Sequence, residues 1–413
     1  MQCVPDTPYQ RTPPEVWLSI FEQATFVSHA FDTDTSDPFD VPGTPIFLDP
    51  LTQNMLRTAL ITKQSLALVC RSWHALATPL LYQAVSVTND RSLLSLRETL
   101  VGRDTRLAPA GSLAVAVRVR RLDLFRWSPS LETAEIFIDV LRRLPDLEVF
   151  CASTRFHLLS GILSCVQAFI ANCAPSLRRC TLSPLSKVTQ PQFEHLFTRC
   201  PHLSHFFIPY PVWAHSPMPL LLPESLTSVS INCPLQNLSH SIPSLQHVYV
   251  WASGSFFNKV ETFLSIQGQY IRTLQIHMSS LDSRGDLLRY TNCCARYCPN
   301  LVHLILIVDT WKTCELPRLS ILATVTHLGV YMGREISPLG LDDCLSFLSA
   351  LFKYQDAMPR VIRTLNTLTE LEQKDLQVNL ALRMQVASVA ARCRFEGADG
   401  NELLLPREDY GMD

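Results

Sequence analysis

Glycine is scarce in this chain, and with it the loops that hold nucleotides. Only 13 of the 413 residues are glycine, and none belongs to a glycine-rich phosphate-binding loop. The sequence also lacks the His-Glu-x-x-His pattern of zinc peptidases and the Gly-x-Ser-x-Gly turn of serine hydrolases. Because no motif supplies a catalytic group, we expect a protein that is not an enzyme and uses no cofactor.

Charged residues are also few, and neither sign prevails. They make up 17% of the chain, and the net charge is −2. This balance lacks the basic excess of a nucleic-acid binder. The longest strongly apolar run, residues 301–308, is too short for a membrane span, and the first residues show no signal-peptide pattern. We therefore expect neither nucleic acid nor membrane as a partner, and a cytoplasmic or nuclear location.

Cysteine is abundant, but its spacing excludes the usual metal sites. The fourteen cysteines include no Cys-x-x-Cys pair and no His–Cys cluster with zinc-site spacing. Cys200, Cys233 and Cys298 each directly precede a proline. We interpret them as small buried residues before a turn, with reduced thiols, and expect no metal.

Two N-terminal stretches have helical periodicity. Pro14 suits a first turn and Glu15 its positive end, so a helix is expected from there to about Phe26. A helix over 51–60 leads into a second stretch, for which we expect N-caps from Thr62 and Ser65 and an end before Pro79. Its apolar residues recur every three or four positions, at Leu66, Val69, Trp73, Leu76 and Leu80.

The letters of these stretches are more specific than their periodicity. Pro13-Pro14-Glu15-Val16, with Ile20-Phe21, is followed after an insert by Leu66-Ala67-Leu68-Val69-Cys70-Arg71-Ser72-Trp73. The pattern resembles the F-box, in the version found in the large family of F-box proteins of mushroom-forming (basidiomycete) fungi. The resemblance assigns adaptor binding to the matching positions, which are Pro13, Glu15, Val16, Ile20, Phe21, Leu66, Val69, Cys70 and Trp73.

The resemblance also sets the first boundaries. Residues 1–11 are expected to be a tail and residues 12–83 an F-box-like domain, with 28–59 as an inserted loop. The insert is rich in Asp, Pro and Thr, but apolar residues such as Phe31 and Phe39 indicate that part of it packs. Thr12 stands where the family usually has Leu.

After residue 87 a repeat takes over. The template L-x-x-L-x-L recurs with first positions 19 residues apart from Leu226 to Leu245 and 30 apart from Leu147 to Leu177. This period brackets that of leucine-rich repeats. The first positions of the nine copies are Val119, Leu147, Leu177, Leu203, Leu226, Leu245, Ile271, Leu301 and Val325.

The repeat predicts an α/β fold. Helices are expected between the copies, at 90–101, 131–144, 162–172, 192–199, 257–268, 286–297 and 341–354. Residues 84–366 would form a curved leucine-rich-repeat solenoid, with parallel strands on the concave face and helices outside. Residues 367–413 would supply a C-terminal cap helix and a tail, with a final strand beginning near Arg394.

Two sets of side chains share the expected concave face. Aromatic residues there predict a protein-binding surface, namely Phe207, Tyr249, Trp251 and Tyr331, with Tyr210 and Trp213 just past a strand. Four histidines fall at the third template position, at His205, His247, His303 and His327. They are either a metal-binding column or a solvated polar row, and the absence of acidic or cysteine partners in that register favours the polar row.

Two functions remain open. The resemblance implies a substrate-recognition adaptor of a Skp–cullin–F-box ubiquitin ligase, in which the box docks on the Skp adaptor and the repeats bind an unknown protein substrate. Such a subunit positions its substrate and catalyses nothing itself. The alternative is a leucine-rich-repeat scaffold with a degenerate box and no ligase role, which Thr12 and the insert favour.

Overall fold

The computed structural model describes most of the chain in segments. They are residues 12–33, 37–41, 51–104, 119–125, 127, 131–152, 162–182, 190–207, 222–231, 240–252, 257–278, 286–308, 324–332, 359–365 and 393–402. The expected tail, the helix at 341–354 and the cap helix after residue 366 lie outside them. The chain divides into two compact units, one of residues 1–34 with 48–205 and one of residues 35–47 with 206–413.

The described strands form a parallel sheet that follows the chain. They lie in the order β1 to β12, and the registered neighbours pair in parallel. This confirms the α/β class. Their bounds are β1 (Ala84–Val87), β2 (Arg121–Leu124), β3 (Val149–Ala152), β4 (Arg179–Leu182), β5 (His205–Phe207), β6 (Ser228–Ile231), β7 (His247–Ala252), β8 (Thr273–Met278), β9 (His303–Val308), β10 (His327–Met332), β11 (Val361–Thr364) and β12 (Arg394–Glu396).

The repeat template explains where the strands begin. The nine first positions are at most 3% exposed, and β2 to β10 follow them at a constant offset. In several copies the N–H of the first position donates to the carbonyl three residues earlier, as from Leu203 to Cys200 and from Leu301 to Cys298. A proline after the cysteine has the φ angle that such a turn requires. Cys200 and Cys298 are fully buried, as expected, and burial raises the pKa of Cys200 to about 12.

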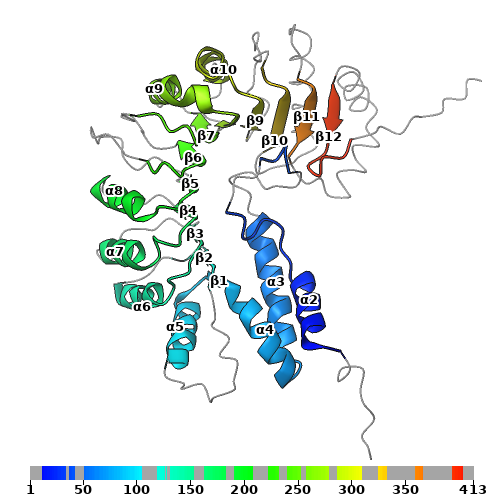
Figure 1. Ribbon diagram of the computed structural model, residues 1–413, viewed down its shortest axis with the longest axis vertical. Coiled ribbons are helices and arrows are strands. Elements are labelled where there is room, and N and C mark those ends of the chain that lie inside the picture. The colour runs from blue at the N-terminus through cyan, green and yellow to red at the C-terminus, as the bar shows by residue number, and fades with distance from the viewer. Residues whose placement is uncertain are drawn as a thin grey trace, which may run out of the picture. The chain divides into compact units, whose positions relative to one another are not determined.

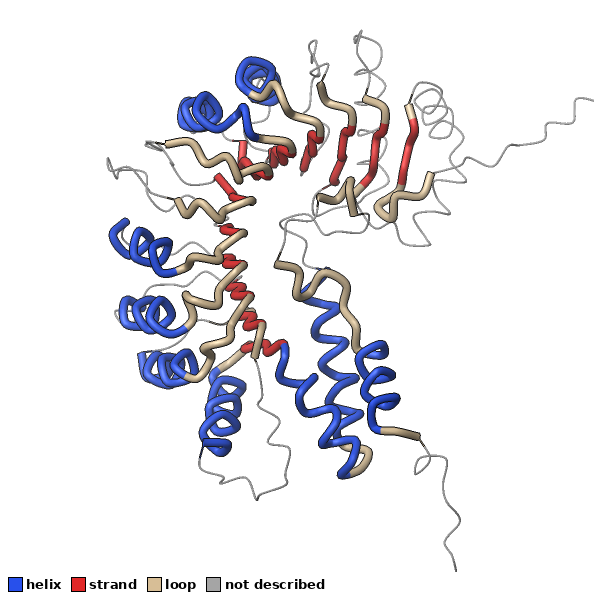
Figure 2. Tube along the Cα trace, in the orientation of Figure 1, coloured by secondary structure: helices blue, strands red, loops and turns tan. Residues whose placement is uncertain are grey.

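In the first unit, helices lie along one side of β1 to β4 (Figures 1 and 2). Consecutive helices pack on one another and bury their apolar faces, as Phe137, Leu141 and Phe193 do. All four match predicted helices within a few residues. They are α5 (Asp90–Asp104), α6 (Leu131–Arg142), α7 (Ile162–Asn172) and α8 (Gln190–Arg199).

The second unit repeats this arrangement. Helices α9 (Phe257–Gln267) and α10 (Asp286–Tyr297) pack against each other on the outer side of β7 to β9. Gly268 follows α9 where a Cβ atom would lie 2.3 Å from the carbonyl oxygen of Tyr297, so only glycine fits this approach. Side chains alternate along each strand, so Leu304 and Leu306 enter the core while His303 and Ile305 point to the opposite face. We call that opposite face the inner face.

Among the described residues of the first unit, three further helices precede the sheet. They are α2 (Pro14–Ala24), α3 (Leu51–Ala67) and α4 (Arg71–Gln83), and α2 packs on both others. We call them the three-helix group. The helix bounds predicted between residues 60 and 79 were wrong. One helix ends at Ala67 and the next begins at Arg71, and the backbone of Cys70 between them is extended.

The reasons lie in side-chain hydrogen bonds and packing. Thr62 and Ser65 do not cap a helix, since their hydroxyls donate to the carbonyls of Thr58 and Ile61 within α3. Pro79 lies inside α4 instead of ending it. Proline there removes one backbone hydrogen bond, but Ala77 and Leu80 are buried on the same helix, and their packing offsets the loss.

Of the described strands, β1, β11 and β12 lie outside the nine template copies. Pro359 occupies the first position before β11, and Arg392 occupies it before β12, so the leucine signal is absent in both. The final strand expected near Arg394 is present as β12, and a turn with Gly400 at φ 76° follows it.

Candidate functional site

The F-box-like positions divide by burial within the three-helix group. Phe21 is buried with Ala67, Ala77 and Leu80, and the half-buried partners Trp17, Leu18, Leu66, Trp73 and Leu76 pack against them. The ring of Trp73 lies 4.8 Å from that of Phe21 and 5.0 Å from that of Trp17, between centroids. Three of the predicted docking residues, Phe21, Leu66 and Trp73, therefore contribute to the core of the group.

The remaining predicted docking residues are exposed. Val16 and Ile20 are each 46% exposed on one face of α2, and Val69 is 61% exposed in the turn before α4. Leu68, beside Val69, is 84% exposed. The contact between Trp17 and Trp73 places this turn at the same end of the group as the start of α2. We call Val16, Ile20, Leu68 and Val69 the apolar patch; Pro13, Glu15 and Cys70 are exposed as well.

Patches of this kind indicate a contact surface. The three-helix group has an apolar core of its own, in which Phe21, Ala77 and Leu80 are almost completely buried. Leaving four aliphatic side chains in water on adjoining elements costs hydrophobic free energy that a binding partner would recover. The exposed side chains are therefore the candidates for binding, and the buried ones hold the group together.

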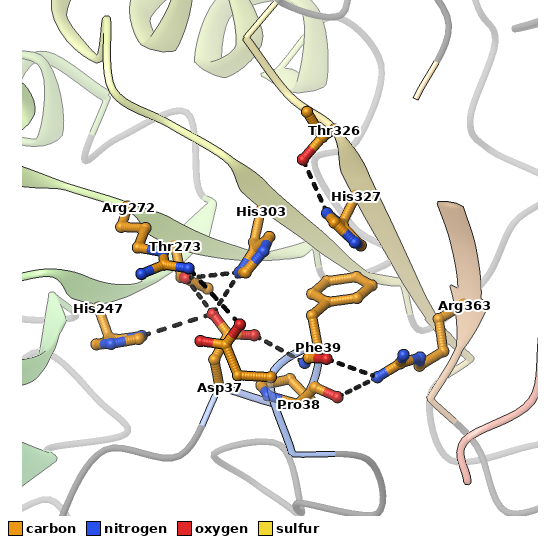
Figure 3. A network of polar contacts seen from close by, with 11 residues as sticks. Asp37, Pro38, Phe39, His247, Arg272, Thr273, His303, Thr326, His327 and Arg363 are labelled. Atoms are coloured by element: carbon orange, nitrogen blue, oxygen red, sulfur yellow. Dashed lines mark hydrogen bonds and ion pairs between the residues drawn. The ribbon is translucent and has the colours of Figure 1, made fainter. Parts of the chain in front are cut away.

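A second candidate site lies on the inner face of the second unit. His247, Thr273, His303 and His327 occupy equivalent places on β7 to β10, directly across the ladder from one another. Residues 37–41 of the predicted insert lie against them (Figure 3). We call residues 37–41 the docked segment.

Asp37 is the centre of the contacts. Its side chain is 1% exposed, and the Thr273 hydroxyl donates to its carboxylate. His303 Nδ1 lies 2.7 Å from Asp37 Oδ2, and because a carboxylate only accepts, the histidine donates. The N–H of Phe39 donates to Asp37 Oδ1 at 2.8 Å. His247 Nδ1 lies 3.8 Å from Asp37 Oδ2. Two strands and the segment itself thus satisfy one buried carboxylate.

Phe39 and the neighbouring carbonyls are held by a second group of residues. The Phe39 ring is 4.9 Å from the His303 ring and 5.1 Å from the His327 ring, between centroids. The guanidinium of Arg363 lies 5.1 Å from the Phe39 ring centroid and donates to the carbonyls of Pro38 and Phe39. Arg363 also donates two hydrogen bonds to the buried Glu396, at 2.6 and 2.8 Å. Each of three consecutive residues therefore contacts the inner face, and His303 and Arg363 each contact two of them.

Burial and hydrogen bonding set the charges at this site. Burial alone would raise the pKa of Asp37, but the hydrogen bond and charge of His303, with the bonds from Thr273 and Phe39, outweigh it and lower the pKa below 3.8. Burial lowers the pKa of His247 below 6.5 despite the nearby Asp37, and burial also lowers that of His327. At neutral pH the site therefore holds a carboxylate beside two neutral imidazoles.

Another part of the insert lies on the inner face of the first unit. Arg121 donates to the carbonyl of Ala30 and forms a buried ion pair with Asp123. The Arg120 guanidinium lies 5.1 Å from the Phe31 ring centroid, and the Ser204 hydroxyl donates to the carbonyl of Thr33. The expectation that part of the insert packs is confirmed for Phe31 and Phe39.

The expected aromatic binding surface needs correction. Phe207 and Tyr249 are 2% and 0% exposed, because the two rings pack at 5.4 Å between centroids and the Tyr249 hydroxyl bonds to His277. Neither is an exposed aromatic. Trp251 is half-buried against the His277 ring, and Tyr331 is half-buried. Tyr210 and Trp213 lie outside the described residues.

The histidine register is confirmed for His247, His303 and His327, but its interpretation as a solvated row was wrong at His205, which is 7% exposed, and at His303. That ring is 2% exposed, and its acidic partner, Asp37, comes from the insert. His205 contacts the hydroxyl of Ser204. Within the described segments, no three His, Cys, Asp or Glu side chains are arranged to hold a metal ion.

Sequence reasoning missed Asp37, Arg363 and Gly329 as site residues. The available signal was the Asp-Pro-Phe sequence inside a polar insert, next to a register of histidines that lacked an acid. Gly329 gave no signal, since its role is to leave space. A Cβ atom there would lie 3.2 Å from the Phe39 ring.

No family model and no curated protein matches the chain. The similarity to F-box proteins therefore stays at the level of motif residues. Among the described helices, none has the length and apolar content that a bilayer crossing requires.

Proposed function

We propose that this chain is a non-catalytic substrate-recognition subunit of a Skp–cullin–F-box ubiquitin ligase. The three-helix group would be an F-box that docks on the Skp adaptor, and the strand–helix units would be leucine-rich repeats that bind a protein substrate. One observation carries the proposal: the motif residues separate into a packed set, the buried Phe21 with the half-buried Leu66 and Trp73, and an exposed set that includes Val16, Ile20 and Val69.

This division is what a docking module requires. Buried motif residues keep three short helices together, and exposed aliphatic residues gain free energy when a partner covers them. The helices pack as one group although residues 25–50 separate α2 from α3 in the chain. The insert therefore does not prevent the three helices from packing together, which supports the proposal of a competent box.

The repeating part supports the substrate-binding role. Strands and helices alternate at the spacing of leucine-rich repeats, and the inner face of the second unit binds residues 37–41, which form a turn. A face that holds one short segment can hold another. The proposed action is positioning: a bound substrate is kept at a high effective concentration near the ubiquitin-conjugating enzyme. We propose a cytoplasmic or nuclear location.

The alternative is a leucine-rich-repeat scaffold whose box binds no ligase. It is favoured by the substitution at Thr12, where the family has Leu, and by the docked segment, which covers part of the surface that a substrate would use. Both functions share one fold, so only adaptor binding separates them.

The test is binding of the full chain to a fungal Skp adaptor, measured by isothermal titration calorimetry. We expect a one-to-one complex. Ile20→Asp and Val69→Asp should each weaken it by about 30-fold, since hot-spot residues contribute about 2 kcal/mol or more. Leu94→Asp is the matched control, because Leu94 is an exposed aliphatic residue on α5, outside the three-helix group.

The outcome discriminates between the two functions. A complex that the first two variants weaken and the control does not would support the adaptor role. A folded chain that shows no binding at roughly 10 μM would contradict it and leave the scaffold. Equal loss in all three variants would also contradict docking through the apolar patch.

A further inference from the structure

The inner face of the second unit contacts each of residues 37–39 of the docked segment. Asp37 is recognised through its carboxylate, Pro38 through its carbonyl, and Phe39 through its ring and carbonyl. The reading groups are Thr273, His303, His327 and Arg363, which come from four consecutive strands. Peptide-binding sites have this property, since they contact backbone groups and particular side chains of the peptide together.

The site holds buried polar groups that simple packing would not need. Asp37, Thr273, His303 and Arg363 are each at most 4% exposed. Removing such groups from water costs several kcal/mol per ion, which is offset only when a partner of opposite character is present. An inner face covered for packing alone would use apolar residues. A face built this way discriminates in favour of an acidic residue, because a neutral one would leave buried donors unpaired.

The place of the aromatic ring is also specified. Gly329 lies between Ile305 and Arg363 in the register, and a Cβ atom there would meet Ile305 at 2.9 Å and the Phe39 ring at 3.2 Å. The missing side chain leaves the space in which the ring lies between His303 and His327. The site thus accepts a carboxylate and, two residues later, an aromatic ring.

The flanking residues contribute less. Asp40 is exposed, and its carboxylate lies 3.6 Å from Arg272, both about half exposed. An exposed pair of this kind is worth at most about 1 kcal/mol. The sequence read by the site is therefore Asp-Pro-Phe, which residues 37–39 supply.

We propose that this site binds Asp-Pro-Phe segments of other proteins and that residues 37–39 are an internal competitor which occupies it in their absence. As the substrate site of a ligase this rests on the proposed function. As a peptide-binding site it does not, because every group that forms it lies in the second unit and none lies in the three-helix group.

Tethering determines how strongly the competitor acts. A segment tethered to its site within the same chain can have an effective concentration on the order of 1 mM. If a free peptide of the same sequence binds the emptied site with a Kd of about 10 μM, the tethered copy weakens its binding to the wild-type chain about 100-fold. Partners would need high local concentration, several copies of the segment or a better sequence to displace it.

The experiment uses the full chain and a fluorescein-labelled peptide of residues 33–43, followed by fluorescence anisotropy. The site is emptied by the double substitution Asp37→Ala with Phe39→Ala. We expect saturable binding to the double variant at micromolar peptide, and binding about 100-fold weaker to the wild type. Peptides with Asn in place of Asp37, or with Ala in place of Phe39, should bind at least tenfold more weakly.

Matched substitutions in the double variant locate the binding. Thr273→Val keeps the shape of the side chain but loses the hydroxyl that donates to Asp37, so we expect at least a tenfold loss of peptide affinity. Thr262→Val is the control, because the Thr262 hydroxyl is exposed on α9 and donates within that helix. Equal affinity in both variants would overturn the assignment of the site.

Failure to bind has a defined meaning. If the double variant is folded by circular dichroism and shows no saturable binding up to about 1 mM peptide, the proposal is wrong. If the double variant does not fold, hydrogen exchange on the wild-type chain replaces it. Peptide at about 10 mM should then speed exchange of the amides of residues 37 and 39–41, and unchanged exchange would overturn the proposal. No adaptor is present in either experiment, so its result is separate from the ligase question.

Discussion

Replacing Arg363 by Met tests the energetics of the inner face most directly. The Arg363 and Glu396 side chains are 5% and 1% exposed, and two hydrogen bonds join them. Removing one partner of a buried pair typically costs about 3–5 kcal/mol, because the other charge stays buried. Arg394 also pairs with Glu396, although its own side chain is 56% exposed, so part of the charge remains compensated. We expect a loss of about 3 kcal/mol, at the lower end of that range.

The double variant Arg363→Met with Glu396→Gln separates the cost of an unpaired buried charge from the cost of the lost hydrogen bonds. With both charges gone, no buried ion is left unpaired, and the remaining cost is that of the hydrogen bonds to Pro38 and Phe39. Net contributions of hydrogen bonds are about 1 kcal/mol each, so we expect the double variant to be more stable than Arg363→Met alone.

The assay is urea denaturation followed by circular dichroism, with the change read from the midpoint at constant slope. Arg97→Met is the control, because the Arg97–Asp139 pair is 45% and 24% exposed and surface pairs contribute at most about 1 kcal/mol. A change below about 1 kcal/mol in Arg363→Met, or a double variant as unstable as the sum of the single ones, would refute the reasoning.

Three further predictions follow from the described contacts. The folded-state pKa values of His247 and His327 lie below 6.5, so the unfolded chain binds protons first and the free energy of unfolding should fall as the pH drops through 6.5. Below about pH 4, protonation of the Asp37 carboxylate, whose folded-state pKa is lowered, should lower the free energy of unfolding further. Denaturation midpoints at pH 7.5 and 5.5 check the histidines, and His247→Asn with His327→Asn should reduce the difference. Trp73→Ala should destabilise the three-helix group by about 3–5 kcal/mol, since it removes a ring packed on Phe21 and Trp17, and loss of helix signal at lower urea would show it. Cys70 should react with a thiol reagent at pH 8 long before Cys173 and Cys200, because Cys70 is exposed and burial raises the pKa of each of the other two thiols to about 12; comparable rates by mass spectrometry would contradict this.

The sheet could be predicted from the sequence because its signal is periodic and local. A leucine at the first template position is buried whatever its neighbours do, and a proline two residues before it supplies the turn. The first position of β11 is Pro359 and that of β12 is Arg392, so the signal ended while the hydrogen-bonded ladder continued. A ladder can add strands through backbone pairing alone, and no side-chain pattern reports that.

The inner-face site could be predicted only in part. Its histidines share a register that is visible in the sequence, but Asp37 is 266 residues from His303, and no local pattern joins two such positions. The same limit explains the error at Tyr249. Alternation placed it on the inner face, but its burial depends on Phe207 and His277, which belong to other strands. Within α4, packing of Ala77 and Leu80 overrode the local preference of Pro79.

The long sequence separations at the docked segment also bear on how the chain forms. The contacts of Asp37 and Pro38 with β9 and β11 span 266 and 325 residues. A ribosome adds about 5–20 residues per second, so roughly 15–65 seconds pass between synthesis of the segment and of its last partner. During that interval the Asp-Pro-Phe sequence has no complete site in its own chain. Residues 37–39 are made early, but Arg363, which binds two of their carbonyls, is made late. A nascent chain that stops before β11 lacks Arg363 and cannot hold these residues as the finished chain does.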